Sequence, residues 1–108
     1  MRDESLYLKD ILEAIHSIER FIGEMSFDEF VADDKTNSAV ARKFEIIGEA
    51  SKNISEKTKI ENPDIPWKEM AGMRDKLIHA YFGISHKILW NTIIHFFPKI
   101  KNRLNQIL

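Results

Sequence analysis

An arginine and a histidine five residues apart are the side chains of this sequence best suited to phosphate chemistry. They lie in the octapeptide Arg74-Asp75-Lys76-Leu77-Ile78-His79-Ala80-Tyr81. Histidine titrates near neutral pH and can move a proton, and arginine offers a rigid fork of donors that holds phosphate oxygens. Metal-independent RNA cleavage uses the 2′-hydroxyl as an internal nucleophile and needs both functions. Arg74 and His79 are therefore the candidate catalytic residues.

Two neighbours in the octapeptide are candidate supporting residues. Asp75 lies one helical turn before His79 and could fix the orientation of the imidazole. Tyr81 offers a hydroxyl and a ring on which a base could stack. Each also has a plainer interpretation, in which Asp75 is a surface acid beside Arg74 and Tyr81 is a rim aromatic with a wet hydroxyl.

The spacing of Arg74 and His79 raises a geometric problem. On an ideal helix, residues five apart differ by about 140° in direction. The two side chains can serve one site in three ways: the helix distorts, the long arginine reaches around, or a second copy of the chain contributes. The spacing alone is a weak signal, because such pairs occur by chance in many helices.

Composition excludes several other kinds of site. The chain has no cysteine, so it has no disulfide, thiolate metal site or cysteine nucleophile. His16, His86 and His95 are expected at the surface or at edges, not arranged as metal ligands, and no metal or cofactor is predicted. The net charge is -1, so any RNA contact must come from a local patch. Lys99, Lys101 and Arg103 are expected on a solvated helix face.

Length and hydropathy indicate one domain of residues 1–108. No apolar run approaches the ~20 residues needed to cross a bilayer. The N-terminus is charged and lacks an apolar segment behind it, so no signal peptide is predicted. We therefore expect a cytoplasmic protein with no membrane contact.

The pattern of apolar residues predicts helices nearly throughout. A first helix is predicted over residues 4–25, a short one over 27–31 with Ser26 as its cap, and a long one over 37–56. Residues 61–66 form a loop because they contain two prolines. The octapeptide lies in a helix over 66–82, and the last helix spans 86–107 with a kink at Pro98. Trp67 and Trp90 are expected as core anchors. The fold class is all-α, an antiparallel bundle of four main helices with a short extra helix.

Several segments of the sequence together resemble one known family. The octapeptide is similar to the Arg-polar-x-x-x-His motif of the HEPN superfamily. With Tyr81 it resembles the Arg-x4-His-x-Tyr form of the HepT-like ribonuclease toxins, the toxin half of HepT/MntA pairs. Residues 44–52, 65–74, 81–84 and 89–93, together with Pro98, extend the resemblance over about the last two-thirds of the chain. Asp75 departs from the family, where many members have asparagine.

The resemblance implies a specific fold, activity and regulation. It implies an HEPN-like bundle that forms a homodimer with the two motifs facing across the interface. The activity is that of a metal-independent RNA endonuclease, the toxin of a type VII-like toxin–antitoxin pair, with Arg74 and His79 catalytic and Asp75 as the polar residue. The implied partner is an MntA-like minimal nucleotidyltransferase antitoxin, which transfers AMP from ATP to Tyr81. Glu49 is either an orienting residue from the preceding long helix or a plain surface acid.

Two alternatives of other classes stay open at this point. In the first, the chain is a catalytically inactive helical module that binds RNA or a nucleotide, or docks a nucleotidyltransferase. In the second it is a structural helical dimer, and mutation of the motif changes only stability.

Overall fold

The computed structural model describes residues 2–79 and 85–108, and for residues 77–79 it describes the backbone only. Seven α-helices lie within these residues and no strand does. They are α1 Glu4–Ile22, α2 Phe27–Ala32, α3 Asp34–Lys52, α4 Glu56–Glu61, α5 Trp67–His79, α6 His86–His95 and α7 Phe97–Ile107. The expected all-α class is confirmed.

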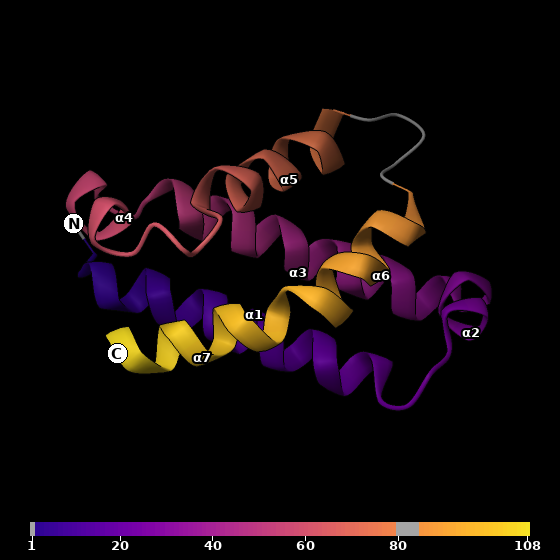
Figure 1. Cartoon of the computed structure of the whole chain (residues 1–108). Helices are drawn as coiled ribbons and strands as arrows, with labels where there is room; N and C mark the ends of the chain where they lie inside the picture. The colour runs from indigo at the N-terminus through magenta and orange to yellow at the C-terminus, as the bar shows by residue number, and fades with distance from the viewer. Residues whose placement is uncertain (1, 80–84) are drawn as a thin grey trace.

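Four long helical segments run in alternating directions along the molecule. Figure 1 shows α1, α3 and α5 side by side, with α6 and α7 returning together as the fourth segment. Both termini lie at the same end of the bundle. The arrangement is the antiparallel bundle expected from the short connections between apolar stripes. No helix within the described ranges is both long and apolar enough to cross a membrane.

The ends of the first helices follow their capping residues. α1 ends at Ile22 instead of the predicted position 25, because Gly23 adopts a positive φ of 53° that stops the helix. The short helix predicted after Ser26 is present as α2. Ser26 and Glu29 form a capping box, in which each side chain accepts a hydrogen bond from the other residue's backbone N–H.

The middle of the chain differs from the predicted boundaries. α3 begins at Asp34, three residues before the predicted start, because the Asp33 side chain accepts a hydrogen bond from the Thr36 N–H and caps the helix there. It ends at Lys52, and a short helix that was not predicted, α4, follows with Ser55 as its cap. The Glu4 carboxylate accepts hydrogen bonds from the Ser55 N–H and the Thr58 hydroxyl, and so ties α4 to the start of α1.

Proline shapes the two later helices. α5 begins at Trp67, directly after Pro66, and the predicted positions 80–82 lie outside the described residues. The predicted kink at Pro98 is a full break between α6 and α7 at Phe96. Pro98 cannot donate a backbone hydrogen bond, and its ring would clash with the carbonyl one turn earlier, so it is tolerated only in the first turn of a new helix.

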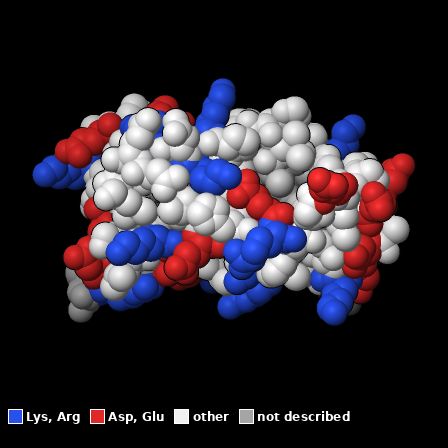
Figure 2. Space-filling model, turned by 90° about the horizontal axis from the view of Figure 1, so that it is seen from below, with Lys and Arg blue, Asp and Glu red and all other residues white. Residues whose placement is uncertain are grey.

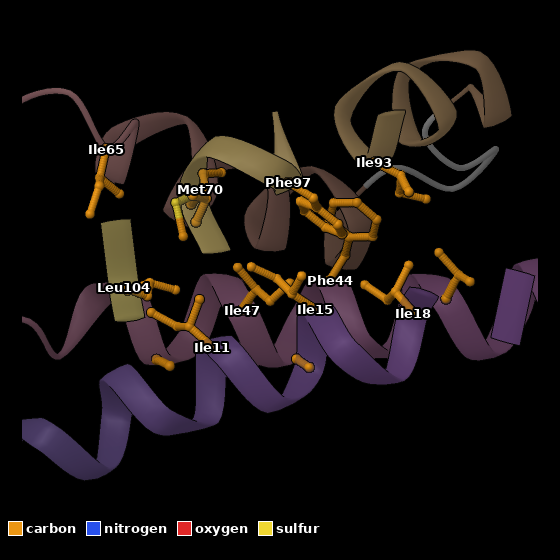
Figure 3. Packing of buried hydrophobic residues seen from close by; sticks show 14 of the residues in the cluster. Ile11, Ile15, Ile18, Phe44, Ile47, Ile65, Met70, Ile93, Phe97 and Leu104 are labelled. Carbon is orange, nitrogen blue, oxygen red and sulfur yellow. The ribbon is translucent and has the colours of Figure 1, made fainter. Parts of the chain in front are cut away.

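The core lies between α1 and α3 on one side and α5 to α7 on the other. In Figure 3, Ile15 and Ile47 point toward Phe97, whose ring stacks on Phe44 with centroids 5.4 Å apart. Trp67 is buried, as expected, and its indole N–H donates to the Asn62 carbonyl at 3.0 Å. Trp90 is only partly buried, at the edge of this core.

α3 and α5 pack closely against each other at Gly48. A Cβ atom added to Gly48 would lie 2.1 Å from the Arg74 Cβ and 3.0 Å from its Cα. Contacts under 3.0 Å essentially never occur between real Cβ atoms and their neighbours. The opposing atoms belong to a helix backbone and its first side-chain carbon, so they cannot move aside as a flexible side chain would. Only glycine permits this packing.

We expect Gly48→Ala and Gly72→Ala to change stability in opposite directions. The first substitution forces α3 and α5 apart and should cost about 2 kcal/mol or more. Gly72 lies in α5 with nothing within 4 Å of an added Cβ. Its replacement should therefore stabilise by roughly 0.5–1 kcal/mol through helix propensity. Urea unfolding followed by circular dichroism at one protein concentration measures both, and a Gly48→Ala protein as stable as the wild type would refute the close packing.

Candidate active site

Arg74 lies where α5 crosses α3, and the crossing places charged residues of both helices together. Its side chain is 31% exposed, so the guanidinium can meet a ligand while its stem is packed. The Nε atom lies 3.2 Å from Glu49 Oε2 on α3. The structure therefore brings Glu49, left open as an orienting or a plain surface residue, into direct contact with the candidate catalytic arginine.

Asp75 accepts from two cations at the same crossing. Its Oδ1 lies 2.6 Å from Lys52 Nζ and 3.3 Å from Arg74 Nη1. The hydrogen bond from Lys52 and, after it, the contact with Arg74 lower the pKa of the Asp75 carboxyl, so it stays ionised at neutral pH. Lys52 was not singled out from sequence, because no local pattern tells a surface lysine that its partner lies 23 residues further along the chain.

The structure describes less of His79 and Tyr81 than of Arg74 and Asp75. His79 is the last residue of α5, its side chain lies outside the description, and Tyr81 lies wholly outside the described residues. The α5 backbone nevertheless bears on the angle between Arg74 and His79. α5 is an uninterrupted α-helix over Trp67–His79, so the two residues leave it about 140° apart. Of the three ways to join them in one site, a distorted helix between them does not occur.

The site opens into a hollow beside the crossing. This arginine hollow has a volume of about 260 Å³ and is lined by Arg2, Tyr7, Asp10, Arg42, Glu45, Ile46, Glu49, Ala50 and Arg74. It lies between the first turns of α1 with the residue Arg2 before it, α3 and α5. Arg2 and Arg42 were not predicted as site residues, since neither lies near the octapeptide in the sequence.

The other histidines lie apart from this crossing. His16 and His95 are exposed, and His86 packs edge-on against Phe30 with ring centroids 5.9 Å apart. Their expected places at the surface or at edges are thus confirmed. In the part of the chain that the structure describes, no three histidine or acidic side chains gather where they could ligate one metal ion.

Comparisons with known proteins agree with the sequence resemblance. The family model described as "Ribonuclease HepT-like" matches residues 11–107. A protein of Thermococcus cleftensis named "Probable ribonuclease HepT" is 51% identical, over 98% of this chain and 96% of its own length. A "Putative RNase" of Methanocaldococcus jannaschii is 46% identical over 98% of this chain and 85% of its length. A further protein named "Putative RNase", from Caldanaerobacter subterraneus, is 40% identical over 100% of this chain and 96% of its own length.

No solved structure matches the chain significantly. The family match covers all helices from the middle of α1 onward, including the α3–α5 crossing that carries Arg74. With this match and relatives that align over nearly their full lengths, the chain belongs to the HepT-like ribonuclease family.

Proposed function

We propose that residues 1–108 act as one domain, a metal-independent RNA endonuclease with Arg74 and His79 as catalytic residues. The observation that carries this proposal is the place of Arg74 at the rim of a hollow, held by Glu49. A guanidinium fixed by a carboxylate keeps donors free to bind phosphate oxygens, since it has five N–H groups. Membership of a ribonuclease family supports the choice of RNA as substrate.

The reaction is an internal transfer at phosphorus. The RNA 2′-oxygen bonds to the neighbouring phosphorus, the bond to the 5′-oxygen of the next nucleotide breaks, and a 2′,3′-cyclic phosphate remains. His79 takes the proton of the 2′-hydroxyl, and the departing 5′-oxygen takes a proton from water. Arg74 stabilises the negative charge that builds up on the nonbridging oxygens. Asp75 supports Arg74 through their contact and stays anionic beside Lys52.

A homodimer would complete the site. The α5 backbone is regular from Arg74 to His79, so the two positions differ by about 140° around the helix axis. Two chains related by a two-fold axis can place the His79 of one protomer opposite the Arg74 of its partner. The two-chain arrangement therefore fits the geometry better than a distorted helix.

Regulation by a partner follows from the family resemblance. We propose that the chain is the toxin of a type VII-like pair, inhibited by an MntA-like minimal nucleotidyltransferase. In that step the Tyr81 oxygen bonds to the α-phosphorus of ATP, pyrophosphate leaves and the hydroxyl proton is released. A bulky anion two residues from His79 would repel RNA phosphate and block its access.

A second candidate function is a catalytically inactive module that binds RNA or a nucleotide, or docks the nucleotidyltransferase. It is favoured by one observation: Arg74 contacts two carboxylates, Glu49 and Asp75, which compete with phosphate for its donors. This module would bind RNA or its partner without cleaving RNA.

The purified chain should cleave RNA in the presence of EDTA and leave cyclic-phosphate ends. Arg74→Ala and His79→Ala should each lower the rate by roughly 10²–10⁴-fold, because each removes a function of the transition state. The exposed Arg20 and His95 provide matched controls, whose alanine variants should cleave normally. Undiminished cleavage by both motif variants would rule out this active site, and RNA binding without cleavage by the wild type would favour the inactive module.

Glu49→Gln should separate positioning of Arg74 from stability. Loss of the charge should lower kcat by roughly tenfold through misplacement of the guanidinium, without raising KM. Stability should change by less than about 1 kcal/mol, because the Glu49 side chain is 59% exposed. Steady-state kinetics and urea unfolding measure the two effects. If the variant has the wild-type kcat, Glu49 is a plain surface acid and does not position Arg74.

Co-expression with a minimal nucleotidyltransferase should add adenylyl groups to Tyr81. Intact-mass analysis should find the increase in the wild type and not in Tyr81→Phe, which should also escape inhibition. The chain has two tyrosines, so Tyr7→Phe is the matched control and should be modified normally. Modification that survives Tyr81→Phe would place the acceptor elsewhere.

A further inference from the structure

Three separate segments each place an arginine around the arginine hollow. Arg2 precedes α1, Arg42 lies in the middle of α3 and Arg74 lies in α5. The segments are far apart in sequence, so only the fold brings these guanidinium groups to one hollow. One of the three is the proposed catalytic arginine, and the other two have no role in the chemistry described above.

The α3 side of the hollow is one continuous helix face. The lining residues from α3 follow one another at steps of three, one, three and one, which places them on one side of the helix. They are Arg42, Glu45, Ile46, Glu49 and Ala50. From Arg42 to Glu49 the helix rises about 10 Å. Arg42 is thus displaced along α3 from the point where Glu49 holds Arg74, so the two guanidinium groups could contact two different anionic groups.

Each arginine is held by a carboxylate from within the hollow. Arg42 Nη1 lies 3.1 Å from Glu45 Oε2, one turn along the same helix. Arg2 Nη1 lies 2.7 Å from Asp10 Oδ2, and its guanidinium lies 4.6 Å from the centre of the Tyr7 ring. These contacts engage a fraction of the five donors that each arginine carries.

The pairs are weak enough to be exchanged for phosphate. The Arg42 side chain is 68% exposed, and exposed ion pairs contribute between nothing and about 1 kcal/mol. A phosphate offers the same guanidinium a bidentate partner. When the arginine neutralises the phosphate, counterions are also released from the RNA. Lining arginines and acids are equal in number, so the hollow has no surplus of positive charge, and a phosphate would bind there by replacing a carboxylate in one of these pairs.

Other basic residues are less suited to the role. Figure 2 shows basic and acidic side chains interspersed over one face of the molecule, without a large field of one sign. On α7, Lys101 pairs with Glu19 at 3.0 Å and Arg103 with Asp64 at 2.6 Å. Both pairs tie α7 to other parts of the bundle, and neither residue lines the hollow beside Arg74.

We propose that the arginine hollow is an RNA-binding subsite, in which Arg42 binds a backbone phosphate next to the one held by Arg74. Arg2 adds a second contact from the N-terminal segment. Glu45 competes with that phosphate for Arg42 and so weakens RNA binding in the wild type. This inference rests on the proposed function for the identity of the ligand, but it concerns binding and not cleavage.

Binding is measured with a labelled single-stranded RNA of about ten nucleotides, in a His79→Ala background that prevents cleavage. Arg42→Ala should weaken binding by roughly three- to tenfold and reduce the slope of log affinity against log salt by about 0.7. Glu45→Gln should tighten binding by roughly twofold, because it releases Arg42. In the double variant that gain should vanish. Lys43→Ala, the next residue of α3 but outside the hollow's lining, is the charge-matched control and should bind normally.

Arg42→Ala and Glu45→Gln should change RNA affinity in opposite directions if the hollow is a subsite. If the two residues formed only a structural pair, both substitutions would change RNA affinity in the same direction. An unchanged salt slope in Arg42→Ala would overturn the proposal, as would an equal loss in Lys43→Ala. The proposal would also be overturned if Glu45→Gln still tightened RNA binding in a variant that lacks Arg42. Cleavage by the otherwise wild-type chain is assayed in parallel. If RNA binding depends on Arg42 but the chain does not cleave RNA, only the proposed catalysis is refuted. If the chain cleaves RNA normally but binding does not depend on Arg42, only the subsite is refuted.

Discussion

The approach of α3 to α5 at Gly48 is the constraint on which the site depends. The absent side chain at Gly48 lets the α5 backbone come so near that an added Cβ would overlap the Arg74 Cβ. At this distance, charged side chains from the two helices meet directly. Glu49 can then reach Arg74, and Lys52 can reach Asp75. With a wider separation, the charged groups of both pairs would be solvated by water instead of contacting each other. The guanidinium would then sample many rotamers before it met a substrate.

The ion pairs at this crossing define positions more than they stabilise the fold. Glu49 and Asp75 are about half exposed, and such pairs contribute little to the free energy of unfolding. The buried apolar residues between the two halves of the bundle supply the stability instead. The charged residues at the surface are consequently available for function, because exchanging an exposed carboxylate for a phosphate costs the folded state little.

Sequence patterns predicted the parts of this structure that depend on local chemistry. Ser26, Pro66 and Pro98 act within a turn of their own positions, so their effects on helix ends or breaks could be inferred. The first helix was predicted to reach residue 25, although the positive φ of Gly23 ends α1 at Ile22. The contact of Gly48 with Arg74, the pairing of Lys52 with Asp75 and the place of Arg42 could not be inferred, because each requires the relative position of two helices. The family resemblance pointed to the motif, and only the packing showed which residues surround it.

The regular backbone of α5 constrains how any chemistry at the motif can proceed. A continuous helix carries Arg74 toward the crossing with α3 and turns His79 about 140° away. In the proposed mechanism, the backbone directions of Arg74 and His79 within one chain therefore favour a site that takes its histidine from a second chain. If the second chain supplies the histidine, catalysis requires association, and the rate per chain depends on protein concentration near the dissociation constant. Binding at the arginine hollow requires no such partner, because Arg2, Arg42 and Arg74 all line it from one chain. Under these two proposals, RNA binding would need one chain and RNA cleavage would need two.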